Sequence, residues 1–146
     1  MDFKHFQVPY TVDPAYQKKV AYFSMEFAIH QPLKIYSGGL GFLSGSHLRS
    51  AYELRQNLIG IGILWKYGYY DQARNQDQTL QVQWNEKIYN FLEDTGIKFK
   101  IEIHGHPVWV KAFYLNPETF KSAPLFLLST DLPENDFVSQ TICHKL

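Results

Sequence analysis

The sequence predicts an α/β fold in which a parallel sheet carries an inserted antiparallel β-hairpin region. Three observations lead to this prediction. Two nearly continuous apolar runs, Val20–Phe27 and Leu58–Trp65, have the composition of buried strands. Between them lie a glycine-dense turn, Ile35–Gly41, and a helical pattern. Beyond Trp65, polar and apolar residues alternate in several short segments, as they do in antiparallel strands.

The first apolar run combines β-branched and aromatic residues, which favour strands. We expect a strand over Val20–Phe27 that is covered on both faces. Glu26 then lies near the carboxyl end of this strand. Its carboxylate either contacts a ligand at that end or accepts hydrogen bonds from backbone N–H groups.

The glycine-dense turn is the main candidate for a binding site. Because Gly38, Gly39 and Gly41 lack a Cβ, their backbone N–H groups can approach a ligand closely. The helix that follows adds the positive end of its dipole, which attracts anions. A phosphate or a polar sugar would suit this loop. The alternative is that the glycines only make a tight connection between a strand and a helix.

Apolar residues at helical spacing predict the helix after the turn. They are Leu40, Leu43, Leu48, Ala51 and Leu54. The second apolar run then completes a strand–helix–strand unit. In such units the crossover is right-handed, and ligands bind beyond the carboxyl ends of the strands. Glu26 and the Gly38–Gly41 loop both fall at that edge of the predicted sheet.

Four more strands are expected in the second half of the chain. Leu80–Trp84 alternates with period two and fits an edge or hairpin strand. Phe99–His104 and Val108–Tyr114 form a hairpin around Gly105. Pro124–Ser129 is a buried strand that returns to the parallel sheet. The sequence shows no internal repeat or linker.

The composition excludes several classes of protein. The 146 residues fit one domain of ordinary size, and the formal net charge of zero argues against a sequence-independent nucleic-acid binder. No apolar run is long enough to span a bilayer, and Met1–Pro14 has no apolar core of a secretory signal. The single cysteine, Cys143, allows no internal disulfide and is expected to be structural. A cytoplasmic location follows as the expectation.

Histidines and a carboxylate later in the chain raise the question of a metal site. Glu102, His104 and His106 alternate along a predicted strand, and these residue types suit zinc or iron. Gly105 and Pro107 instead place His106 in or beyond a turn, so we expect no metal site. His30 precedes the glycine turn; it either reaches a ligand hydroxyl or is a surface loop residue.

Three segments together resemble the N-terminal domain of the α-glucan (glycogen, starch or maltodextrin) phosphorylases. They are Tyr22–Phe27, Tyr36–Gly41 and Gly60–Gln72, in this order and spacing. The resemblance is greatest to the shorter bacterial and archaeal forms, and extends from about Val20 to Asn135. It divides the chain into a lead-in segment, 1–19, and an incomplete N-terminal domain, 20–146.

The resemblance implies a Rossmann-like N-terminal half of a GT-B glycosyltransferase. Such enzymes use inorganic phosphate to release glucose 1-phosphate from an α-1,4-glucan, with pyridoxal phosphate as cofactor. By this similarity, Gly38 and Gly39 approach the substrate phosphate, Leu40 borders the glucosyl subsite and Gly41 permits entry into the helix. Glu26 and His30 would line the cleft.

The resemblance also implies that an essential part lies elsewhere. In this family the lysine that holds pyridoxal phosphate belongs to the second domain, and no lysine of this chain sits in that motif. We therefore expect the chain to be inactive alone and to need a C-terminal domain or its separate chain. The sequence also departs from family patterns at Ala28, Phe42 and Ser46, each of which replaces a larger or polar residue.

Two alternatives stay open at this stage. A nucleotide-sugar-dependent glycogen or starch synthase also uses a Gly-Gly-Leu-Gly loop, although such enzymes place Lys-Thr before it, and this chain has Tyr36 and Ser37. The other alternative is a non-catalytic glucan-binding or vestigial fragment. Such a fragment would leave an apolar cleft face uncovered.

Overall fold

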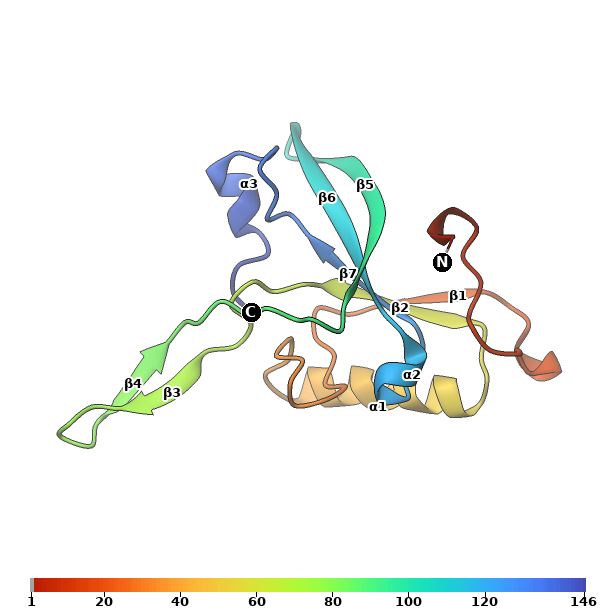
Figure 1. Cartoon of the computed structure of the whole chain (residues 1–146), viewed down its shortest axis with the longest axis horizontal. Coiled ribbons are helices and arrows are strands. Elements are labelled where there is room, and N and C mark those ends of the chain that lie inside the picture. The colour runs from red at the N-terminus through yellow and green to blue at the C-terminus, as the bar shows by residue number, and fades with distance from the viewer. Residues whose placement is uncertain (1) are drawn as a thin grey trace.

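The computed structural model describes residues 2–146 and is built on a five-stranded mixed sheet with the strand order β1-β2-β7-β6-β5 (Figure 1). Three strands, β1 (Val20–Phe23), β2 (Leu58–Ile63) and β7 (Leu125–Ser129), run parallel to one another. The remaining two, β6 (His106–Leu115) and β5 (Glu93–Ile103), continue the sheet in antiparallel fashion. The predicted α/β class is thus confirmed, and the hairpin belongs to the same sheet.

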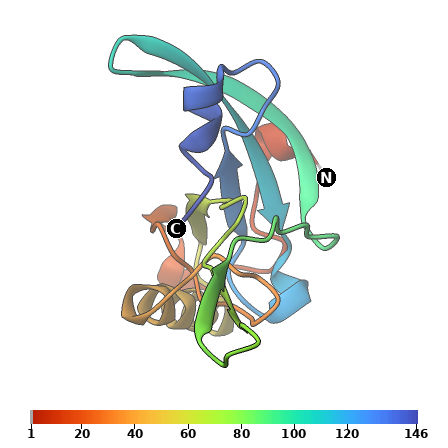
Figure 2. The ribbon, with the colours of Figure 1, turned by 90° about the vertical axis from the view of Figure 1, so that its left-hand side faces the viewer.

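One face of the sheet is covered by helices. Helix α1 (Gly39–Glu53) connects β1 to β2, and the short helix α2 (Pro117–Phe120) lies on the same side (Figures 1 and 2). Tyr52 Oη of α1 donates to Glu118 Oε1 of α2 at 2.6 Å. Leu48 of α1 is fully buried and packs over Gly60, where a Cβ would lie 2.9 Å from its Cδ1. The absent side chain therefore lets α1 lie close to β2.

The first strand is shorter and more exposed than the sequence predicts. β1 ends at Phe23, because Ser24 Oγ donates to the carbonyl oxygen of Glu26 at 2.9 Å and closes a turn. The expectation that both faces of β1 are covered is wrong for the described chain, since Val20 is 43% and Phe23 70% exposed. Phe23 lies on the face opposite α1, which no helix of residues 2–146 covers at this position.

The long hairpin confirms the predicted turn at Gly105. His104 and Gly105 both have positive φ, 50° and 78°, which is the conformation of a tight turn that matches strand twist. Strand β5 begins at Glu93 rather than at Phe99, and its pairing with β6 is irregular between Asp94 and Lys98. Because of this irregularity, the alternation of polar and apolar residues did not predict the first part of β5.

A separate two-stranded ribbon projects from the sheet (Figure 1). It consists of β3 (Asp71–Arg74) and β4 (Leu80–Gln83), which agrees with the predicted hairpin strand. Lys87 forms an ion pair with Asp71 and so ties the chain after the ribbon back to its first strand.

The lead-in segment lies against the antiparallel part of the sheet. It contains two single 3₁₀ turns, Phe3–His5 and Pro14–Tyr16. The ring of Phe6 packs edge-on against Tyr114 and Phe126, with centroid distances of 5.6 and 5.0 Å. Within residues 2–146, no helix has the length and apolar composition needed to cross a bilayer.

A buried amide side chain joins β6 to the segment after β7. Asn135 Oδ1 accepts from Trp109 N at 2.8 Å, and Asn135 Nδ2 donates to the carbonyl oxygens of Trp109 and Thr130 at 2.8 and 2.7 Å. The segment continues into α3 (Phe137–Thr141).

Replacing this amide is expected to destabilise the fold. The Asn135→Ala substitution leaves three polar backbone groups without their partner, which should lower the free energy of unfolding by about 2 kcal/mol. Urea denaturation of the variant measures the effect. Glu134→Ala, at the exposed neighbouring position, is the control and should change stability by less than about 1 kcal/mol. Equal stability of Asn135→Ala and the unaltered chain would contradict the prediction.

Candidate functional site

The glycine turn lies at the carboxyl edge of the parallel strands and forms the amino end of α1. Gly38 is the N-cap residue, and no side chain caps this end of the helix. The first helical hydrogen bond runs from Phe42 N to Gly38 O at 3.2 Å. The N–H groups of Gly39, Leu40 and Gly41 have no acceptor among residues 2–146, as expected for the first turn of a helix. Gly39 and Leu40 are exposed, so their N–H groups are open to a ligand, whereas Gly41 is buried.

The space around the loop differs between its glycines. A Cβ added at Gly38 or Gly39 would meet no atom within 4 Å. One added at Gly41 would lie 2.5 Å from Tyr36 Cβ. Gly38 and Gly39 thus face open space, whereas Gly41 is a packing position. Leu40, beside them, is half exposed. This outward-facing backbone is the arrangement that close approach of a ligand requires.

Glu26 holds the loop in place from the end of β1. Its Oε2 accepts hydrogen bonds from Ser37 N at 2.8 Å and from Gly38 N at 3.4 Å. Its Oε1 accepts from Ser37 Oγ at 3.1 Å. The interpretation of Glu26 as a carboxylate that accepts backbone N–H groups is confirmed. Because Gly38 N is engaged, the free donors of the loop are those of Gly39, Leu40 and Gly41.

A pair of serines connects the helix to the turn after β1, and sequence reasoning missed it. Ser44 is fully buried, and its Oγ lies 2.8 Å from Ser24 Oγ and 2.9 Å from Leu40 O. Ser24 Oγ in turn contacts the backbone of Glu26. The first turn of α1 is thus fixed relative to the end of β1. The signal in the sequence is Ser44 itself, a polar residue on the apolar face of the predicted helix.

The other predicted cleft residue, His30, lies in a different place. Its ring stacks on that of Phe120, with centroids 4.6 Å apart. The adjoining carbonyl of Ile29 accepts a hydrogen bond from Arg49. Arg49 follows Gly39 by ten residues, which is about 15 Å along a helix. His30 is exposed at this position. The structure therefore brings Glu26 to the loop and places His30 near α2.

A shallow apolar groove adjoins the same edge of the sheet. It has a volume of about 290 Å³, and its lining comes from the ends of the three parallel strands. The lining residues are Phe23, Ser24, Met25, Ile61, Gly62, Ile63 and Leu128. Trp65 Nε1 donates to Met25 O at 2.9 Å and fixes the loop at its rim.

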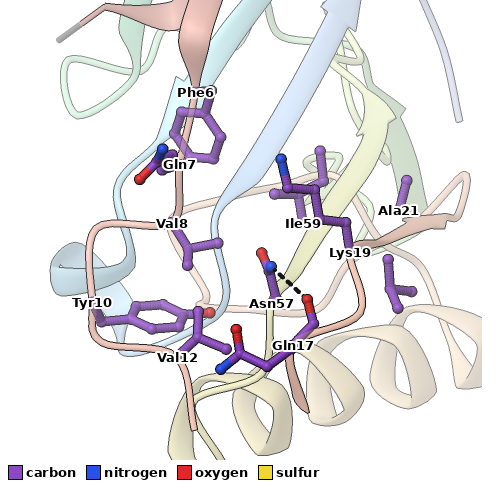
Figure 3. Close-up of a pocket in the computed structure, with 11 residues that line it drawn as sticks. Phe6, Gln7, Val8, Tyr10, Val12, Gln17, Lys19, Ala21, Asn57 and Ile59 are labelled. Carbon is purple, nitrogen blue, oxygen red and sulfur yellow. Dashed lines mark hydrogen bonds between the residues drawn. The ribbon is translucent and has the colours of Figure 1, made fainter. Parts of the chain in front are cut away.

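A larger cavity, of about 530 Å³, lies at the opposite, amino edge of β1 and β2 (Figure 3). The lead-in segment forms one wall, and Asn57 and Ile59 belong to the other. Tyr10 Oη donates to Gln56 O at 2.9 Å, and burial raises the pKa of Tyr10 to about 12. Asn57 Nδ2 donates to Gln17 O at 3.0 Å. Near neutral pH the Tyr10 phenol therefore stays protonated, and the Asn57 amide does not titrate.

The remaining polar candidates are structural or paired. Cys143 is 1% exposed, and Thr130 N donates to its Sγ at 3.3 Å, which confirms a structural cysteine. His106 begins β6, and its Nε2 lies 2.6 Å from Asp136 Oδ2. Over residues 2–146, no three His, Cys, Asp or Glu side chains gather in a way that could hold a metal ion.

The three departures from the family pattern occupy exposed or tightly packed positions. The ring of Phe42, on the solvent side of α1, is 62% exposed and lies edge-on to Tyr36 at 5.6 Å. Ala28 N donates to Gly41 O at 2.8 Å, and Ala28 O faces Gly45 of the helix. Ser46 is exposed. The backbone of Ala28 thus packs directly on α1.

A Schiff-base amine needs a lowered pKa, and two lysines of this chain show the opposite shift. The hydrogen-bonded ion pair with Asp131 raises the pKa of Lys66, and the one with Glu118 raises that of Lys121. Both shifts favour the charged ammonium form, which is not nucleophilic. Lys66 and Lys121 therefore do not fit covalent attachment of pyridoxal phosphate.

Comparison with known proteins shows what this chain is similar to. No protein-family model matches it. It is 54% identical to the uncharacterized protein MJ1631 of Methanocaldococcus jannaschii, over 88% of this chain and 25% of that protein. It is 36% identical to maltodextrin phosphorylase of Thermococcus litoralis, over 99% of this chain and 18% of that enzyme. It is 32% identical to glycogen phosphorylase of Mycobacterium tuberculosis, over 87% of this chain and 15% of that enzyme.

The chain thus spans a quarter or less of the length of each of these relatives. The matches to the named enzymes cover most of the chain and agree with the resemblance that rests on Tyr22–Phe27, Tyr36–Gly41 and Gly60–Gln72. The chain is accordingly homologous, as an N-terminal fragment, to the maltodextrin and glycogen phosphorylases.

Proposed function

We infer that this chain forms the beginning of a GT-B α-1,4-glucan phosphorylase, which releases glucose 1-phosphate from glycogen or maltodextrin with inorganic phosphate. The observation that carries this proposal is the outward-facing amino end of α1. There the N–H groups of Gly39, Leu40 and Gly41 have no acceptor in the described chain, and Gly38 and Gly39 border open space. Phosphate would bind at these amides, and Leu40 would border the glucosyl group.

The chemistry of phosphorolysis explains the use of such a loop. Attack of phosphate on a glucosidic bond brings negative charges close together beside an oxocarbenium-like centre. Fixed N–H donors stabilise this arrangement without reorganisation. Glu26 and the Ser24–Ser44 pair keep the donors in position from the protein side. Backbone amides do not ionise near neutral pH, so another group must supply the general acid.

That group would come from a part of the enzyme outside these residues. Pyridoxal phosphate supplies a proton-donating phosphate group in this family, and no lysine of this chain sits in the motif that attaches it. The lead-in segment 1–19 and the incomplete domain 20–146 therefore act with a C-terminal domain, fused or separate. The isolated chain should bind glucan and phosphate weakly and turn over neither.

The alternatives differ in their support. Two of the three relatives named above are phosphorylases by name, and none of the three is named as a nucleotide-sugar-dependent synthase. A non-catalytic fragment is favoured by one observation, the exposed apolar face at Phe23, which a complete domain would cover. The two surviving proposals differ in whether this chain supports catalysis within a whole enzyme.

A chimeric enzyme tests the proposal. The 146 residues of this chain replace the matched stretch of maltodextrin phosphorylase from Thermococcus litoralis. The chimera is expected to release glucose 1-phosphate from maltodextrin only when phosphate is present, and the isolated chain to release none. The control is the same enzyme with the matched stretch deleted. A chimera that folds and holds pyridoxal phosphate, yet shows no phosphorolysis, would contradict the proposed function.

A further inference from the structure

The two-stranded ribbon of β3 and β4 projects from the sheet (Figure 1), and one of its faces gathers aromatic and apolar side chains. Gln72 pairs with Val82 and Arg74 with Leu80, so alternate residues of both strands share this face. The same register places Tyr70 opposite Trp84, and their ring centroids lie 6.0 Å apart. We call this face the ribbon strip; its residues are Tyr70, Gln72, Arg74, Leu80, Val82 and Trp84.

The ribbon strip is open to solvent. Leu80 is 65%, Val82 54% and Trp84 37% exposed. The Lys145 ammonium lies 4.5 Å from the ring centroid of Trp84, which helps to hold the indole in place. Groups of exposed apolar side chains mark sites where a protein binds another molecule. The ribbon strip is therefore a candidate binding surface.

The inner end of the ribbon strip lies beside the glycine loop. Gly68 has a φ of 59° and packs on the backbone that leads into the loop, since a Cβ there would lie 2.2 Å from Lys34 O. Tyr69 comes next, and its ring centroid lies 4.4 Å from that of Tyr70. A hydrogen bond to Tyr70 raises the pKa of Tyr69, and the nearby Glu26 carboxylate raises this pKa further. The ribbon strip thus begins near the loop and leads away from it.

The side chains of the ribbon strip suit a sugar chain. A pyranose ring has an apolar C–H face and a rim of hydroxyls, so it can stack on an aromatic ring and hydrogen-bond to polar groups beside that ring. Tyr70 and Trp84 supply the rings, and Gln72 and Arg74 supply hydrogen-bonding groups. From Tyr70 to Arg74 the strand spans about 13 Å, which is longer than one sugar ring.

The charge of the ribbon strip argues against a nucleic acid as the ligand. Single-stranded nucleic acids also stack on aromatic rings, but they need a positively charged groove along the backbone. Among the six residues of the strip, Arg74 is the only cation, and the whole chain has a formal net charge of zero. A neutral, hydroxyl-rich chain fits this surface better than a polyanion.

We propose that the ribbon strip binds an α-glucan chain, with Tyr70 and Trp84 stacked on glucosyl units and Gln72 and Arg74 in contact with hydroxyls. This inference rests on the proposed function, which supplies the class of ligand. The strip holds the glucan away from the bond that is cleaved, so its contacts are the same in the ground state and the transition state. It therefore lowers KM for longer glucans without changing kcat.

Nuclear magnetic resonance of the tryptophan indoles tests the binding in the isolated chain. The chain has three tryptophans, and Trp65, which is 5% exposed, and Trp109, on the long hairpin, are internal references. Maltoheptaose at millimolar concentration should shift the indole N–H signal of Trp84 and leave the other two in place. Glucose at the same concentration should shift none of them. An unshifted Trp84 signal with maltoheptaose would overturn the proposal.

Matched variants show whether the aromatic ring is responsible. Titration of the backbone amide signals of β3 and β4 should show maltoheptaose bound about tenfold more weakly by Trp84→Ala. Trp84→Phe, which keeps a ring, should stay within about threefold of the unaltered chain. Phe137→Ala, which removes an exposed ring from α3, is the control and should bind normally. Gly39→Val, which blocks the glycine loop, should also bind normally. Equal binding by Trp84→Ala and Phe137→Ala would contradict the proposal.

The chimera separates this inference from the proposed function. There, Trp84→Ala should raise KM for maltoheptaose several-fold and keep kcat and the KM for phosphate. An active chimera whose KM for maltoheptaose does not respond to Trp84→Ala would overturn the role of the ribbon strip and still support the function. Glucan binding by the isolated chain beside an inactive chimera would support the strip and count against the function.

A thiol variant tests whether protein covers the ribbon strip instead. Trp84→Cys in the chimera should react readily with a thiol reagent and more slowly once maltoheptaose is added, while the buried Cys143 stays unreactive. A thiol at position 84 that is already shielded without glucan would show that another part of the enzyme occupies the strip. That result would overturn the proposal.

Discussion

In the chimeric phosphorylase, the Gly39→Val substitution is expected to lower the rate of glucose 1-phosphate release about 100-fold or more. The reason is steric. The space in front of Gly39 is open in this chain, and a branched side chain would fill it where a phosphate must approach the backbone. Removing a single fixed donor from a site of developing charge already costs about 100-fold in other enzymes. The measurement is initial rate at varied phosphate concentration.

Matched variants show whether the loss comes from the ligand site. Gly39→Ala, with a smaller side chain, should lose less activity than Gly39→Val. Phe42→Val, at an exposed position in the same helical turn, should keep most of it. In the isolated chain all three should unfold at similar urea concentrations, because a Cβ at position 39 meets no atom within 4 Å. Full activity of the Gly39→Val chimera would show that phosphate does not bind at this loop.

The sequence predicted correctly those features of the fold that depend on residues close together in the chain. The strand–helix–strand unit and the loop at its carboxyl edge followed from hydrophobic pattern and glycine content alone. Each of these features depends on neighbours close in the chain, so a pattern analysis can find it. The turn at His104 and Gly105 is of the same kind, since both residues tolerate or need positive φ.

Other features depend on contacts that the pattern does not encode. The run Val20–Phe27 reads as one strand, yet β1 stops at Phe23 because the hydroxyl of Ser24 binds the backbone of Glu26. The sequence likewise does not predict that Phe23 is exposed, because the composition of the run suits burial on both faces. The composition of Val20–Phe27 is more typical of a strand inside a sheet than of an edge strand such as β1.

The role of Glu26 becomes clear only when the sequence and the structure are considered together. Sequence reasoning left open whether its carboxylate binds a ligand or the loop, and the structure shows it accepting from Ser37 and Gly38. It therefore acts on the site through the loop backbone. A ligand anion would meet the exposed amides of Gly39 and Leu40, with the carboxylate behind them. The positive end of the α1 dipole then serves both negative groups.

The close contact of α1 with the backbone of Ala28 makes Gly45 critical for stability. Gly45→Ala is expected to lower the free energy of unfolding of the chain by about 3 kcal/mol. A Cβ at this position would lie 2.1 Å from the carbonyl oxygen of Ala28 and 2.7 Å from its carbonyl carbon. Both atoms belong to the backbone and cannot rotate away. Alanine gains about 1 kcal/mol over glycine in helix propensity, which is too little to offset the clash.

Relieving the clash in Gly45→Ala would displace the glycine loop at the start of α1. To make room, α1 must move away from Ala28, whose N–H donates to Gly41 O at 2.8 Å in the first turn of the helix. That movement shifts the amides of Gly39, Leu40 and Gly41 relative to Glu26. Urea denaturation measures the stability, and Ser46→Ala, exposed at the next position, should differ from the unaltered chain by less than about 0.5 kcal/mol. If Gly45→Ala is as stable as Ser46→Ala, then α1 does not lie against the backbone of Ala28, and the placement of the loop has to be revised.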